Sequence, residues 1–228
     1  MNISTSKFIN SSSVELGGAV SARDSLTVLV SFTEFLHCSA DDSGGAISTV
    51  AAKEFAIHNC LFVQNIAYGA GGGAVFGKSS PLILEYSTFL KNIAPKGGGG
   101  CLFWDGPFDP SIDFSADVNI FQESIGSFNE KTLSDRFSAA GNEAAYGSCL
   151  ASTLKKLLLS EMPTRKTPAY PGLPLSLSVL KKDAYNQTII TDSSTVLFSQ
   201  SAQLGDKSSV DPFLASLHSC TFRVLPIG

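Results

Sequence analysis

Short runs in which apolar and polar residues alternate recur in the first part of the chain, for example over residues 26–32 and at Phe55 to Ile57. A period of two is typical of β-strands, and valine, isoleucine, phenylalanine and threonine, which favour strands, dominate these runs. The runs themselves repeat, because phenylalanines recur every 27 residues, at Phe8, Phe35, Phe62 and Phe89. This pattern predicts a repeat built of β-strands.

Equivalent positions of the copies carry residues of one kind. The aligned sets include Ile3, Val30, Ile57 and Leu84; Ala40, Ala67 and Ala94; and Val20, Ile47, Val75 and Leu102. Such sets indicate that like side chains stack, each strand pairing in parallel with its counterpart one coil later, about 4.8 Å away. A helical repeat is disfavoured because each copy carries a glycine pair, and glycine inside a helix costs about 1 kcal/mol relative to alanine.

Glycine and asparagine have expected roles at the corners of this coil. Gly45, Gly73 and Gly100 belong to glycine pairs, which suit corners that need a positive φ or a close approach of the backbone. Asn65 and Asn92 share one aligned position, where stacked amides are expected to form a hydrogen-bonded ladder.

These motifs resemble a known repeat family. Phe62-Val-Gln-Asn65 and Phe89-Leu-Lys-Asn92, with the blocks Gly44 to Ile47 and Gly72 to Val75, are similar to the FxxN and GGA[ILV] repeats of chlamydial polymorphic outer membrane proteins. Related repeats occur in large surface proteins of microbial eukaryotes. The resemblance covers about residues 1 to 150 and implies a right-handed parallel β-helix of the pectin-lyase-like type with a surface or adhesive role.

The period is lost after Cys101, since Phe137 follows Phe89 by 48 residues rather than 27. An insert is therefore expected at about residues 104–132, as a loop or an irregular coil. The predicted organisation is a β-helix over residues 1–153, a cap and linker over 154–171, and an incomplete Ig-like β-sandwich over 172–228.

The Ig-like prediction depends on two alternating runs, 173–182 and 187–192, joined by a turn from Asp183 to Asn186. The segment resembles the opening strands of extracellular Ig-like modules, where a D-x-[YF]-[GN] sequence leads into the second strand. Further strands are expected at residues 196–198 and 220–224. Because the repeat is already in phase at Ile3, further coils of a longer chain are expected N-terminally.

Composition narrows the class of protein. Hydrophobic residues make up 43% and charged residues 16% of the 228 residues, which excludes a disordered chain. The net charge of −4 argues against a nucleic-acid partner. No cofactor is expected, because no zinc, phosphate-loop or hydrolase motif is present.

The cysteines and asparagines suggest covalent modification. Cys101 and Cys149 both replace the alanine of a Gly-Gly-Ala block and form a candidate disulfide, with buried free thiols as the alternative. Cys38 and Cys60 are offset too far to pair. Asn2, Asn10 and Asn186 stand in N-x-[ST] sequences and are candidate glycosylation sites on a eukaryotic secretory route.

The insert suggests an alternative function. Asp105, Asp109, Asp113 and Asp117 are spaced by four and lie near the single tryptophan, while Asp41 and Asp42 lie two coils away. Polysaccharide lyases and glycoside hydrolases on β-helices use carboxylates, with Ca²⁺ or as an acid and base pair. The preferred interpretation remains a non-catalytic structural or adhesive segment of an extracellular or cell-surface protein, with other proteins or surface glycans as partners.

Overall fold

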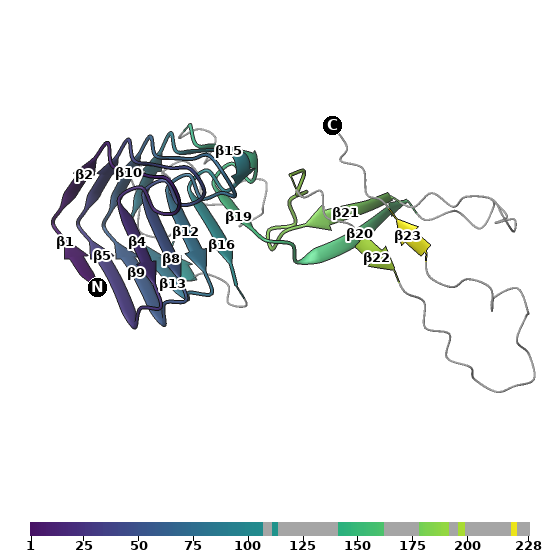
Figure 1. Cartoon of the computed structure of the whole chain (residues 1–228), viewed down its shortest axis with the longest axis horizontal. Helices are drawn as coiled ribbons and strands as arrows, with labels where there is room; N and C mark the ends of the chain where they lie inside the picture. Colours follow the sequence, from purple (N-terminus) through teal and green to yellow (C-terminus); the bar gives the residue numbers. More distant parts are fainter. Residues whose placement is uncertain (107–110, 114–140, 162–177, 192–195, 199–219, 223–228) are drawn as a thin grey trace, which may run out of the picture.

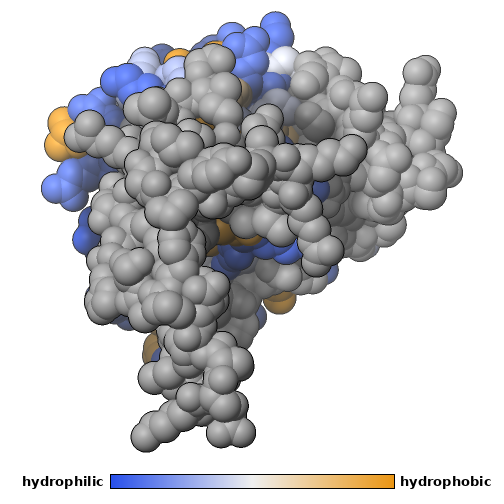
Figure 2. Space-filling model, turned by 90° about the vertical axis from the view of Figure 1, so that its right-hand side faces the viewer, coloured by the Kyte–Doolittle hydropathy of each residue, from blue (hydrophilic) through white to orange (hydrophobic). Residues whose placement is uncertain are grey.

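The computed structural model describes residues 1–106, 111–113, 141–161, 178–191, 196–198 and 220–222. These residues form strands and no helix, which confirms the predicted all-β class. Figure 1 shows a parallel β-solenoid of about four turns, with the antiparallel strands β20 to β23 extending beyond its last coil. In the view from that end, the described residues that remain visible are mainly hydrophilic, with a few hydrophobic residues among them (Figure 2).

The described strands of the solenoid form four parallel sheets, named A to D in the order in which the chain visits them. Sheet A consists of β1 (Asn2–Ser4), β5 (Thr27–Ser31), β9 (Glu54–His58), β13 (Leu82–Glu85) and β17 (Ser111–Asp113). Sheet B consists of β2 (Lys7–Ile9), β6 (Glu34–Leu36), β10 (Leu61–Val63) and β14 (Thr88–Leu90). Sheet C consists of β3 (Ser12–Ser13), β7 (Ser39–Ala40), β11 (Ile66–Ala67), β15 (Ile93–Gly98) and β18 (Glu143–Tyr146). Sheet D consists of β4 (Val20–Arg23), β8 (Ile47–Val50), β12 (Val75–Lys78), β16 (Leu102–Asp105) and β19 (Leu150–Ser152).

The pairing places like residues on like residues, as the sequence period predicts. In sheet B the register joins the four repeat phenylalanines, Phe8, Phe35, Phe62 and Phe89. Their rings stack nearly parallel, with centroids 5.1, 4.9 and 4.7 Å apart. Phe35 and Phe62 are fully buried, so this file forms the centre of the core together with the inward aliphatic residues of sheets A and D.

A buried asparagine ladder lies beside the phenylalanine file. The Asn65 amide donates to Asn92 Oδ1 at 2.9 Å, and the Asn92 amide donates to Asn142 Oδ1 at 3.0 Å. Each amide also donates to a phenylalanine carbonyl, and Asn92 Oδ1 accepts from the backbone N–H of Asn65 at 3.0 Å. The ladder thus satisfies polar groups in the interior, where an unpaired group would be costly.

Every coil turns at residues with a left-handed backbone. Glycine serves at the corner between sheets C and D, where Gly44 has a φ of 69° and a Cβ on Gly45 would overlap the carbonyl oxygen of Gly73. In this pair the first glycine has the predicted positive φ, and the second allows the predicted close approach of the backbone. The other corners use residues with side chains at φ between 47° and 56°, namely Thr5, Phe32, Asn59 and Tyr86; Asn10, His37, Gln64 and Lys91; and Asp24, Ala51 and Ser79.

The regular coil continues beyond Trp104 into the segment predicted as an insert. Trp104 lies in β16, and β17 pairs with β13 in register, Glu85 opposite Asp113. The next described strand is β18, so the additional residues enter between sheets A and C of the fifth coil. Residues 107–110 and 114–140, which include Asp109, Asp117 and Phe137, lie outside the described residues.

A disulfide joins the coils on either side of this interval. Cys101 and Cys149 are bonded inside the core, with their Cα atoms 4.5 Å apart, at the adjacent positions that their Gly-Gly-Ala blocks predict. Cys38 and Cys60 are free and buried.

The tight turn from Asp183 to Gln187 covers the end of the last coil. The Asp183 carboxylate accepts from the backbone N–H of Ser152 at 3.2 Å and from those of Tyr185 and Gln187 at 2.9 and 2.8 Å. The Gln187 amide donates to the Leu150 carbonyl at 2.8 Å, and Tyr185 packs against the core. These contacts provide hydrogen-bond partners for the N–H of Ser152 and the carbonyl of Leu150 at the edge of β19, which is the role of a solenoid cap.

This cap uses residues that the sequence pattern assigns to an Ig-like hairpin. Within the described part, the two predicted runs meet at the bridge between Lys182 and Thr188. β21 (Ser178–Lys182) pairs antiparallel with β20 (Lys156–Glu161), and β22 (Val196–Phe198) pairs antiparallel with β23 (Cys220–Phe222). Most of residues 172–228 lie outside the described residues, and the Ig-like module stays a prediction.

We expect Asn92→Ala to lower the free energy of unfolding by about 3 kcal/mol or more, because it leaves the Asn65 backbone N–H buried without a partner and removes the Oδ1 that accepts from the Asn65 side-chain amide. Gln64→Ala is the matched control, since Gln64 is exposed at a neighbouring corner, and its effect should stay within about 0.5 kcal/mol. Urea denaturation measures both. Equal effects of the two substitutions would contradict the role of the ladder.

The cap should weaken as pH rises. Burial raises the pKa of the Asp183 carboxyl above its ordinary value of 3.8, so the folded state favours the protonated form. The stability that Asp183 provides is therefore complete below pH 3.8 and declines as pH rises through the raised pKa. The difference in unfolding free energy between the wild type and Asp183→Asn, measured by urea denaturation from pH 3.5 to 7, should shrink with pH. A difference that grows with pH would refute this.

Candidate binding groove

A groove of about 550 Å³ runs across the outer face of sheet C, next to the corner that leads from sheet B. Three residues of that corner, His37, Gln64 and Lys91, form one wall, one from each successive coil. Half-buried Ile66 and Ile93 point outward from sheet C along the floor. Because the coils are about 4.8 Å apart, the wall follows the solenoid axis and presents a new side chain at each step.

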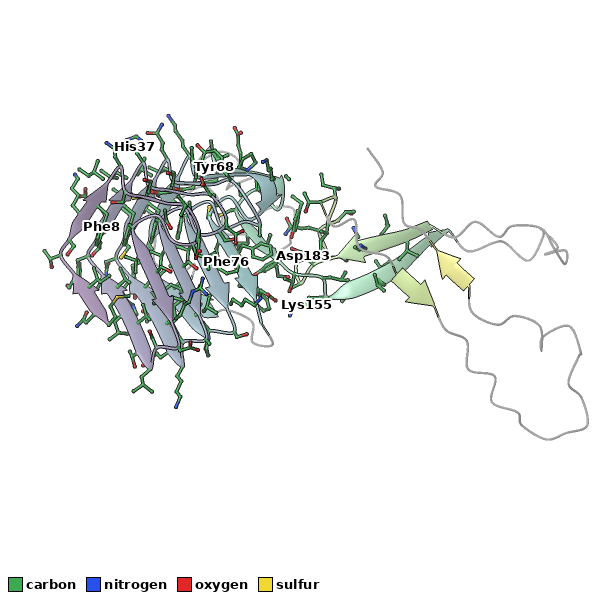
Figure 3. The ribbon with its side chains drawn as sticks, in the orientation of Figure 1. Phe8, His37, Tyr68, Phe76, Lys155 and Asp183 are labelled. Atoms are coloured by element: carbon green, nitrogen blue, oxygen red, sulfur yellow. A yellow bond between two sulfur atoms is a disulfide. The ribbon has the colours of Figure 1, made fainter. Side chains whose placement is uncertain are left out.

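The groove is completed by Tyr68, Ser39, Gly141, Glu143 and Cys38, of which Cys38 is fully buried. Tyr68 is 45% exposed, and His37 and Tyr68 lie along the same rim of the solenoid (Figure 3). The sequence period predicts that residues of this kind face outward, but it contains no motif that marks them as a site. The sequence signal for such a site is an aligned, outward position at which residues of different chemistry follow one another from coil to coil.

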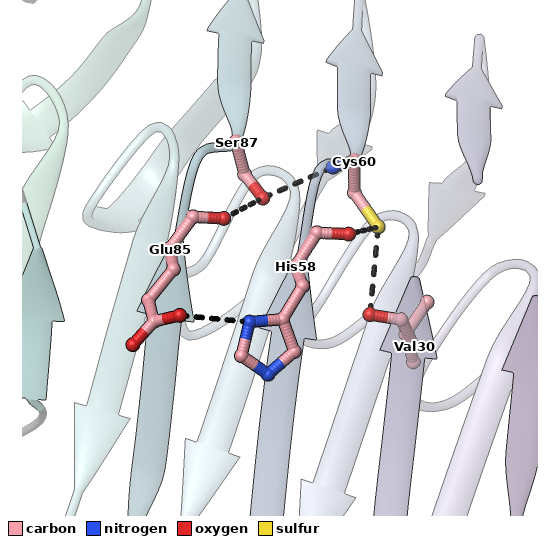
Figure 4. A network of polar contacts seen from close by, with 5 residues as sticks. All are labelled: Val30, His58, Cys60, Glu85 and Ser87. Carbon is pink, nitrogen blue, oxygen red and sulfur yellow. Dashed lines mark hydrogen bonds and ion pairs between the residues drawn. The ribbon is translucent and has the colours of Figure 1, made fainter. Parts of the chain in front are cut away.

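Three pairs of outward side chains elsewhere on the solenoid join successive coils. Lys7 contacts Glu34 at 2.6 Å on sheet B, and Lys78 contacts Asp105 at 3.5 Å on sheet D. On sheet A, His58 Nδ1 lies 3.0 Å from a Glu85 carboxylate oxygen (Figure 4). The side chains of the groove differ. Among the described residues, no hydrogen bond or ion pair engages the side chains of His37, Gln64, Tyr68, Lys91 or Glu143.

The two buried thiols have structural surroundings. Cys60 Sγ lies 3.3 Å from the His58 carbonyl oxygen and 3.7 Å from that of Val30, and Ser87 Oγ accepts from the Cys60 N–H (Figure 4). Burial raises the pKa of Cys60 to about 11 and also raises that of Cys38. A thiol with such a pKa holds its proton at neutral pH and is a poor nucleophile.

Two acidic residues of the alternative, enzymatic interpretation, Asp105 and Asp42, have other partners in the structure. Asp105 ends β16, and its carboxylate accepts from the Thr153 hydroxyl at 3.1 Å and contacts Lys78. Asp42 Oδ1 accepts from the Ser43 hydroxyl at 3.2 Å, and exposed Asp41 precedes it in the same turn. Asp42 follows sheet C and Asp105 ends sheet D, so they lie at opposite ends of the strands of sheet D.

Asp113 lies in β17, opposite Glu85, and Asp109 and Asp117 lie outside the described residues. In the part of the chain that the structure describes, no three histidine, cysteine or acidic side chains gather where they could hold a metal ion such as the predicted Ca²⁺.

Trp104 does not provide a platform for a sugar ring. It is 4% exposed, its indole N–H donates to the Tyr185 hydroxyl at 3.1 Å, and the Lys155 ammonium lies 4.5 Å from its ring centre. It therefore belongs to the packing between the last coils and the cap.

The candidate glycosylation sites Asn2, Asn10 and Asn186 are all exposed. Asn10 occupies the corner position equivalent to His37, one coil earlier, and therefore lies at the N-terminal end of the groove wall. Across the described ranges, no helix is long and apolar enough to span a membrane.

Comparisons with known proteins found no family model, no curated protein and no solved structure that matches the chain. The solenoid is therefore shown by the structure, and the resemblance to the chlamydial repeats depends on the sequence motifs.

We expect Cys38 and Cys60 of the folded chain to resist alkylation by iodoacetamide at pH 7.5, because both thiols are buried and their pKa values are raised. After unfolding in guanidinium both should react fully, which peptide mass spectrometry can quantify at each position. Rapid labelling of Cys60 in the folded protein would show a reactive thiol instead.

Proposed function

We propose that this chain is a non-catalytic structural or adhesive segment of an extracellular or cell-surface protein, in which the solenoid presents the groove on sheet C to other proteins or glycans. The observation that carries the proposal is the set of polar side chains along the groove, including Gln64, Tyr68 and Lys91, which form no hydrogen bond or ion pair among the described residues and border the half-buried Ile66 and Ile93. Exposed polar groups next to a half-buried apolar floor are typical of a binding surface.

The disulfide supports an extracellular setting. Stable disulfides are characteristic of oxidising compartments and are rare in the cytosol, and the Cys101–Cys149 bond is buried in the core. The three exposed N-x-[ST] sequences are compatible with the same route.

The solenoid suits an adhesive role because its binding residues sit on a rigid frame. The backbone of the groove floor is held on both sides by neighbouring coils, and the wall residues are fixed at corners of defined φ. A preorganised surface loses little conformational freedom when a partner binds.

The proposal predicts saturable binding of the fluorescently labelled chain to cultured animal or plant cells. Tyr68→Ala combined with Lys91→Ala should weaken this binding at least about tenfold, because both side chains are exposed in the groove. His58→Ala combined with Glu85→Ala is the matched control, since it removes a whole pair from the outer face of sheet A. Flow cytometry measures both. Absence of saturable binding, or equal loss in the two variants, would overturn the proposal.

A further inference from the structure

The floor of the groove cannot pair with the backbone of a partner. The N–H groups of Ser39, Ile66, Ile93 and Glu143 each donate to the preceding coil at 2.9 Å. A peptide that binds by adding a strand needs free backbone groups at a sheet edge, whereas the groove exposes the face of a sheet. Recognition in the groove must therefore come from side chains.

The side chains of the groove combine two kinds of contact at short intervals. Ile66, Ile93 and the exposed ring of Tyr68 offer apolar surface, while the imidazole of His37, the amide of Gln64 and the ammonium of Lys91 offer hydrogen-bonding groups. Sugar rings present apolar C–H faces and hydroxyl groups in the same alternation. The amide of Gln64 can both donate to and accept from a hydroxyl group.

The shape and the charge of the groove further limit the class of ligand that fits it. The groove spans four coils, from His37 to Gly141, or about 14 Å at 4.8 Å per coil, and so fits an elongated chain rather than a compact molecule. The charges of Lys91 and Glu143 offset each other on adjacent coils, so the groove has no strong preference for an ionic ligand.

We propose that the groove is a binding site for a linear, uncharged oligosaccharide that lies along the solenoid axis. This inference rests on the proposed function and makes it more specific. The sugar rings pack on Ile66, Ile93 and Tyr68, and their hydroxyl groups bond to Gln64, His37 and Lys91. The ligand chemistry is a polyhydroxylated chain.

The test uses isothermal titration calorimetry on the full chain, produced without N-linked glycans, with cellohexaose, laminarihexaose, maltohexaose and chitohexaose as probes. We expect at least one hexasaccharide to bind saturably with a stoichiometry of one. Tyr68→Ala and Gln64→Ala should each weaken binding about tenfold, and the paired His58→Ala and Glu85→Ala control should leave it unchanged. Affinity for an uncharged ligand should change less than about twofold between 50 and 500 mM NaCl.

Circular dichroism and urea denaturation show that each variant is folded before it is titrated. The inference is overturned if none of the four probes binds, if the groove variants bind as well as the wild type, or if a heparin hexasaccharide binds tightly with a strong dependence on salt. If the chain binds cells but binds none of the hexasaccharides, the glycan ligand is overturned and the adhesive function stands. Loss of both would overturn both.

Discussion

The structure depends on one constraint, the parallel pairing of each strand with its counterpart in the next coil. This pairing satisfies the backbone polar groups and fixes every side chain about 4.8 Å from its equivalent. A residue that stacks well on itself is therefore favoured along a whole file. Phenylalanine does so by ring stacking, and asparagine does so because its amide both donates and accepts.

The same constraint limits which charges the surface can carry. Like charges repeated along a file would repel one another at this spacing, and at some outward positions the next coil carries the opposite charge, as in Lys7 with Glu34 and Lys78 with Asp105. The corner file of the groove carries His37, Gln64 and Lys91, which do not form such pairs with one another. The side chains of this file do not stabilise the solenoid by pairing between coils, so contact with a partner would not break such pairs.

The sequence allows most of the solenoid to be predicted, since the spacing of Phe35, Phe62 and Phe89 fixes the register directly. Other features leave no local signal. The corners at Phe32 and His37 adopt a positive φ without glycine, because the surrounding pairing holds them there. Asp183 belongs to a turn typical of several β-folds, and its role as a cap becomes visible through its contact with Ser152, far away in sequence. The groove leaves no local signal either, because its residues come from successive coils and meet only in the folded chain.

The interruption of the period shows that register is set by contacts in space rather than by counting residues. Leu102 pairs with Leu150, and Asn92 bonds to Asn142, although 48 and 50 residues separate them. The ladder and the disulfide therefore hold the residues that follow the insert in the register of the coil. The additional residues add only a small entropic cost, because the cost of loop closure grows slowly with loop length. Gly141 and Glu143 flank Asn142 in the sequence and line the end of the groove. The stability of the solenoid and the shape of the groove thus depend on the same inter-coil bonds.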